Sequence, residues 1–188
     1  MRLRNRIRYL ARRRRLDADL AEELRLHREM AENAALRAGA TPEDARREAN
    51  LAFGSEAIAL ENLALGYIGL GQSGPALRSL IEARGLAQTI HDQERLFSLD
   101  LVEIELLLAE GKLESVFGKL AKAAEVMKKS KYASEAPRFL RLSADAEIKA
   151  GRREEALKTL KKGLEECRKQ KNRPEEARMV VLQKMLAE

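Results

Sequence analysis

This 188-residue sequence contains two histidines, His27 and His91, and one cysteine, Cys167. These are the side chains best suited to catalysis or metal binding. A thiol nucleophile needs a base beside it, and no histidine lies near Cys167 in the sequence. Adjacent acids such as Glu165 and Glu166 lie on an exposed helical surface and do not face each other, so they form no acid–base pair. One cysteine cannot make an internal disulfide or a cysteine-based metal site. We therefore expect no catalytic residue, no metal and no cofactor, and a protein that acts by binding.

The composition favours helices as the elements that carry any binding surface. Ala, Leu, Glu, Lys and Arg make up well over half of the chain, and these residues are strong helix formers. Val, Ile and Thr are too few for a sizeable sheet, and aromatic residues amount to 4%. No apolar run reaches the roughly 18 residues that a membrane-spanning helix needs, and the N-terminus lacks the apolar stretch of a secretory signal. The sequence predicts a soluble, cytoplasmic, all-α protein.

The net charge of +6 is concentrated at one end of the chain. Residues 1–15 contain no acid, and Leu3, Ile7 and Leu10 are spaced to share one face of a helix. A basic amphipathic arm of this kind favours an anionic membrane surface as its partner. Nucleic acid, bound through its phosphates, and a frayed end without a partner are the alternatives. The arginines of the arm are Arg2, Arg4, Arg6, Arg8, Arg12, Arg13, Arg14 and Arg15.

Residues 16–54 have the pattern of two short helices joined by a tight turn. In the first helix His27 lies within an apolar face, which predicts a packed structural histidine. Gly39 is placed to end that helix, and Gly54 is placed to end the second. The apolar face of the first helix comprises Leu20, Leu24, His27, Ala31, Ala34 and Ala35, and the apolar edge of the second comprises Ala45, Ala49 and Phe53.

This segment resembles the permease prefix domain, a short module that precedes the membrane part of certain bacterial ABC-type permeases. The resemblance covers residues 1–54 and includes the arginine-rich start. It implies a place at the inner face of the bacterial cytoplasmic membrane, but no transport activity, because the membrane helices of that family do not follow. The matching residues are Leu20, Glu22, Glu23, Leu24, His27, Gly39, Thr41, Pro42, Glu43, Asp44, Ala45, Arg46, Arg47, Ala49, Phe53 and Gly54.

Residues 55–188 repeat a pattern with a period of 40, marked by Gly71, Gly111 and Gly151. Predicted helices flank each glycine, over residues 56–70 and 75–90, 94–110 and 113–130, and 135–150 and 153–171. This organisation is typical of stacked helix pairs, in which each repeat packs on its neighbours. The repeat positions are Tyr67, Gly71, Ala76, Leu80 and Ala83; Leu107, Gly111, Val116, Leu120 and Ala123; and Gly151, Ala156, Leu160 and Gly163.

The spacing around these glycines resembles the tetratricopeptide repeat (TPR), with HEAT-type repeats as the structural alternative. The resemblance implies a right-handed solenoid of three repeats over residues 55–91, 92–131 and 132–171. It also implies a groove that binds a peptide or helix of a partner protein. The groove residues would be Glu61, Asn62, Leu65, Leu101, Glu105, Leu108, Arg138, Arg141, Asp145, Lys149 and Arg178.

A final helix over residues 174–187 stops before a fourth repeat is complete. It is interpreted either as a capping helix or as the last part of a fragment or shortened gene. This helix is apolar for a cap, so we expect it to pack on the third repeat and leave some apolar surface for a partner. Its apolar residues are Val180, Val181, Leu182, Met185 and Leu186.

The sequence as a whole predicts a bacterial scaffold or adaptor without enzymatic activity, held at the cytoplasmic membrane face by its basic arm. The alternative is a cytosolic TPR-type regulator whose arginine-rich arm contacts nucleic acid. An enzyme and a remnant without a function of its own are the remaining hypotheses.

Overall fold

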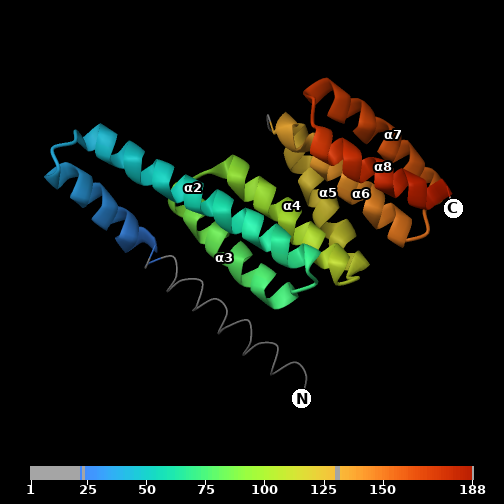
Figure 1. Cartoon of the computed structure of the whole chain (residues 1–188), viewed down its shortest axis with the longest axis horizontal. Helices are drawn as coiled ribbons and strands as arrows, with labels where there is room; N and C mark the ends of the chain where they lie inside the picture. Colours follow the sequence, from blue (N-terminus) through green and yellow to red (C-terminus); the bar gives the residue numbers. More distant parts are fainter. Residues whose placement is uncertain (1–21, 23, 130–131, 188) are drawn as a thin grey trace, which may run out of the picture. The chain divides into compact units, whose positions relative to one another are not determined.

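A computed structural model describes residues 22, 24–129 and 132–187, and within these ranges the chain is helical without a strand (Figure 1). This confirms the all-α prediction. The predicted basic arm, residues 1–15, lies outside the described residues. The elements are a helix over residues 24–37, α2 (Pro42–Gly69), α3 (Ser73–Thr89), α4 (Gln93–Ala109), α5 (Leu113–Lys129), the 3-10 turn η1 (Ala133–Glu135), α6 (Ala136–Lys149), α7 (Arg153–Gln170) and α8 (Arg173–Ala187).

The helix boundaries predicted from residue 75 onward lie within about two residues of the observed ones. Gly71, Gly111 and Gly151 follow α2, α4 and α6 with φ angles of 70°, 71° and 74°, in the left-handed region that glycine adopts without strain. His91 and Lys171 end α3 and α7 in the same conformation, at φ 57° and 56°. Because these two turns carry no glycine, the sequence did not show that they share the conformation of the turns at Gly71, Gly111 and Gly151.

The predicted helix end at Gly54 is wrong, because α2 continues through this residue to Gly69. A glycine inside a helix costs about 1 kcal/mol relative to alanine, which packing around it outweighs. Phe53 and Ala57, on either side of Gly54, are buried against Leu86 of α3. The proposed boundary between residues 54 and 55 therefore falls in the middle of a continuous helix.

The described residues divide into two compact units, one that ends at Leu99 and one that begins at Asp100. In the first unit, Thr41 accepts a hydrogen bond from the Asp44 amide through its side chain and caps the start of α2 as predicted. Its core is formed by Leu24, Phe53, Ala57 and Leu86. The core of the second unit near the C-terminus is formed by Ala144, Ala156, Leu160, Leu164, Cys167, Met179 and Leu186.

The small and apolar repeat positions that follow the turn glycines are buried in all three copies. A Cβ atom on Gly163 would lie 2.6 Å from Sδ of Met179, so α8 packs directly on the glycine of α7. The absence of a side chain at this position therefore allows the close approach of α8. The buried positions are Ala76, Leu80, Ala83, Val116, Leu120, Ala123, Ala156, Leu160 and Gly163, while Tyr67 and Leu107 are half-buried.

The prediction of a packed His27 is wrong, because its side chain is exposed. Of the predicted apolar face in the described part of the first helix, only Leu24 is buried. Leu24 packs this helix against Phe53 and Ala57 of α2, and two polar contacts add to this: Arg28 donates to Asn50 at 3.1 Å and Arg46 donates to Glu32 at 3.0 Å. Among the described residues, no helix combines the length and apolar character required to cross a membrane.

Candidate partner-binding surface

The predicted groove residues differ in how far they are exposed to solvent. Four of them are buried in contacts between helices, which corrects their assignment to an open groove: Glu61, Leu101, Leu108 and Arg141. Four are half-buried: Leu65, Glu105, Arg138 and Asp145. Three are exposed: Asn62, Lys149 and Arg178.

In the first unit, Glu61 joins α2 to α4. Its carboxylate accepts hydrogen bonds from Nη1 of Arg95 and from Oγ of Ser98, both at 2.7 Å. The residue is only 5% exposed, and a buried carboxylate is tolerated when a cation and further donors satisfy it. Glu61 therefore holds the fold together and does not face a partner.

In the second unit, Arg141 joins α6 to both α4 and α8. Its Nε donates to Glu175 at 2.6 Å and its Nη2 donates to Glu105 at 2.9 Å. Burial alone would lower the pKa of Arg141, but the two carboxylates raise it, so the guanidinium stays charged. Arg138 and Arg178 extend the network, at 3.6 Å from Glu105 and 2.9 Å from Glu175. We call these five residues the α4–α6–α8 ion network.

Glu175 is the member of this network that sequence reasoning missed. It follows Arg141 by 34 residues, the same separation that joins Glu61 to Arg95. A search for opposite charges at this separation in neighbouring repeats would have found both pairs. Because Arg138 and Arg141 already face carboxylates of the same chain, they do not form a free basic cluster for an acidic ligand.

Asp145 lies close to this network, and the free energy of unfolding should depend on pH through its carboxyl group. Burial raises its pKa, and the charge of Glu105 adds to this, while Lys149 and Arg141 oppose it. A raised carboxyl pKa in the folded state means that the ionised side chain destabilises the fold at neutral pH.

Asp145→Asn is therefore expected to increase the free energy of unfolding at pH 7. Its advantage over the wild type should shrink as the pH falls through the raised pKa of Asp145, because the protonated wild-type side chain no longer carries the buried charge. Urea unfolding at pH 7 and at about pH 4 measures this difference, with the exposed Glu154→Gln as control. A constant difference between the two pH values would contradict the assignment.

An exposed stripe on α2 is the surface best suited to a partner. Helical spacing places it opposite the buried side of the helix. Leu51 is 62% exposed and Ile58 is 42% exposed, although both belong to a well-formed helix. We call this the α2 outer stripe, and it consists of the exposed Arg47, Leu51, Ile58 and Asn62 together with the half-buried Leu65.

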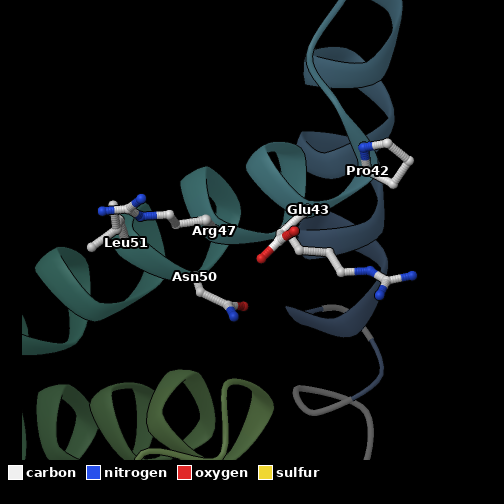
Figure 2. Close-up of a pocket in the computed structure, with 6 residues that line it drawn as sticks. Pro42, Glu43, Arg47, Asn50 and Leu51 are labelled. Carbon is white, nitrogen blue, oxygen red and sulfur yellow. The ribbon is translucent and has the colours of Figure 1, made fainter.

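The N-terminal end of the α2 outer stripe borders an open hollow of about 710 Å³. Figure 2 shows Arg47, Asn50 and Leu51 along α2, with Glu43 and Pro42 at the start of the helix. With Arg46 as a further lining residue, the hollow combines two apolar side chains with two guanidiniums, a carboxylate and an amide. This mixture suits a polypeptide ligand better than a small apolar molecule.

Of the two histidines and the cysteine, only Cys167 occupies a buried, structural position. Cys167 is fully buried, and burial, followed by the nearby Glu175 and Glu176 carboxylates, raises the pKa of its thiol. The thiol is therefore protonated at neutral pH and is a poor nucleophile. Across the part of the chain that the structure describes, no group of three or more His, Cys, Asp or Glu side chains is arranged to hold a metal ion.

No family model, curated protein or solved structure matches this chain.

Proposed function

We propose that this chain is a non-enzymatic scaffold or adaptor, built as a TPR-like array of helix pairs, that binds an amphipathic helix of a partner protein along the α2 outer stripe. The observation that carries the proposal is the presence of apolar side chains on two opposite sides of α2. One side, from Ala45 to Ala64, is buried in the first unit. The other side exposes Leu51 and Ile58 at a separation of seven residues, two turns of the helix.

The chemistry of the α2 outer stripe defines the partner. Two apolar side chains two turns apart match the spacing of anchor residues on an amphipathic helix. Arg47 at one end can receive a carboxylate from the partner, and Asn62 near the other end can exchange hydrogen bonds with its backbone or side chains. The partner helix would therefore present apolar residues at i and i+7 and an acid beyond one of them.

The arginine-rich residues 1–15 supply the second part of the proposal, attachment to the cytoplasmic face of a bacterial membrane. Each arginine near an anionic surface contributes on the order of 1 kcal/mol. The alternative is attachment of the same arm to nucleic acid, for which the high arginine content and the absence of acid are the favouring observations.

Co-purification from the native cell tests the docking surface. The tagged full chain is expected to retain a protein that is lost from the double variant Leu51→Ser with Ile58→Ser. The matched control is Leu157→Ser on α7, whose exposure of 43% nearly equals the 42% of Ile58. Loss of the same protein from both variants, or from neither, would contradict docking at the α2 outer stripe.

Cell fractionation tests the arm separately. The full chain is expected in the membrane pellet, and a chain without residues 1–15 in the supernatant. If both are found in the supernatant, membrane attachment is refuted, and salt-dependent binding of the full chain to DNA and RNA becomes the next measurement.

A further inference from the structure

The terminal helices of the described chain both expose apolar side chains, where the end of a helical array is normally polar. On α8, Val181 is 58% exposed and Met185 is 60% exposed, with Val180 beside them at 37%. On the helix over residues 24–37, Met30 is 65% exposed and Leu26 is 47% exposed. We call these the α8 outer face and the hairpin outer face, because the helix over residues 24–37 forms a helical hairpin with the start of α2.

The two faces have matching ridges. Val181 and Met185 are four residues apart, as are Leu26 and Met30, so each pair forms a ridge along one side of its helix. An exposed alanine extends each ridge by one further turn. It is Ala177 on α8 and Ala34 on the helix over residues 24–37. An antiparallel arrangement would pair the two ridges turn by turn over three turns.

The charges beside the ridges are complementary in the same antiparallel arrangement. Lys184 is exposed beside the α8 outer face at its C-terminal end, whereas Arg178 near the other end binds Glu175 at 2.9 Å. Glu22 is exposed at the N-terminal end of the hairpin outer face. Antiparallel contact brings Glu22 toward Lys184, whereas antiparallel contact between two α8 outer faces would bring Lys184 of each copy toward Arg178 of the other.

We propose that the chain associates head to tail with a second copy of itself, through the α8 outer face of one copy and the hairpin outer face of the other. The contact is heterologous, so each copy keeps one unused face and further copies can be added. Partner recognition by the α2 outer stripe uses other residues and is independent of this contact. Two helix faces of about three turns bury less area than a standard interface, so we expect weak association.

Sedimentation equilibrium of the full chain up to about 0.5 mM tests this proposal. The wild type should show an average mass that rises with concentration beyond that of the monomer. Met30→Lys places a cation against the apolar ridge of α8, one turn from Lys184, and Val181→Ser with Met185→Ser removes that ridge. Each variant alone should remain monomeric, while Leu157→Glu on α7 should associate like the wild type. Circular dichroism confirms that the exposed substitutions preserve the helices.

Mixing the two interface variants distinguishes head-to-tail contact from a symmetric one. The Met30→Lys copy keeps its α8 outer face and the α8 variant keeps its hairpin outer face, so an equimolar mixture should form a dimer and stop there. A mixture that stays monomeric overturns the proposal. Loss of association in only one of the two variants would indicate contact between identical faces and would also overturn the proposal. A wild type that remains monomeric at every concentration would do the same.

Discussion

Replacing Arg141 by alanine is expected to lower the free energy of unfolding of the second unit by about 3–5 kcal/mol. The side chain of Arg141 is 8% exposed and lies against the carboxylates of Glu105 and Glu175, which are 20% and 10% exposed. Without the guanidinium, two carboxylates on α4 and α8 remain partly buried on either side of a cavity. Urea unfolding followed by circular dichroism at 222 nm measures the effect, since the chain has no tryptophan.

The exposed Arg153→Ala on α7 is the matched control for this prediction and should change the free energy of unfolding by less than about 0.5 kcal/mol. A second variant separates the buried charges from the loss of packing. The triple replacement Arg141→Met, Glu105→Gln and Glu175→Gln should recover part of the lost stability, because the neutral amides remove the uncompensated buried charges and can still accept hydrogen bonds from Arg138 and Arg178. A loss below about 1 kcal/mol for Arg141→Ala would show that the α4–α6–α8 ion network does not hold these helices together.

Gly163→Val is expected to destabilise the second unit by about 1–3 kcal/mol through overpacking. The added Cβ would meet Met179 Sδ at 2.6 Å and Met179 Cε at 2.8 Å, with Leu140 Cβ at 3.3 Å on another side. The end of the methionine can move, but Cβ of Leu140 is fixed to the backbone of α6. Thermal unfolding measures the change.

Gly118→Ala on α5 is the control for Gly163→Val, because a Cβ there meets no atom within 4 Å. It should stabilise the chain by up to about 1 kcal/mol through helix propensity alone. Combining Gly163→Val with Met179→Ala should cost less than the sum of the two single changes, because the shortened side chain leaves room for valine. Additive costs would contradict direct packing of α8 on Gly163.

The sequence predicted the helices from residue 75 onward well because their ends carry local signals. Gly111 and Gly151 adopt the left-handed conformation that ends a helix, and the residues that follow at fixed offsets are buried. Gly54 gave the same local signal and was misinterpreted, because tertiary packing of Phe53 and Ala57 carries α2 through it. Local propensity is a weak signal wherever such packing decides the outcome.

The candidate site was harder to predict, since exposure depends on which side of a helix faces its neighbours. Asn62 is exposed on α2, but the adjacent Glu61 points toward α4 and binds Arg95. Leu51 and Ile58 were missed because an apolar residue in a helix is ordinarily assigned to the core. Glu175 was missed because its role depends on a contact with Arg141 of another helix.

The most direct test of docking at the α2 outer stripe is photocrosslinking in the native cell. A photoreactive amino acid at Asn62, which is exposed beside Ile58, should give a discrete adduct with one partner protein. The same group at the exposed Lys158 of α7 should not give that adduct, and Leu51→Ser with Ile58→Ser should abolish it. Absence of an adduct at position 62, or the same adduct at positions 62 and 158, would contradict the proposed binding surface.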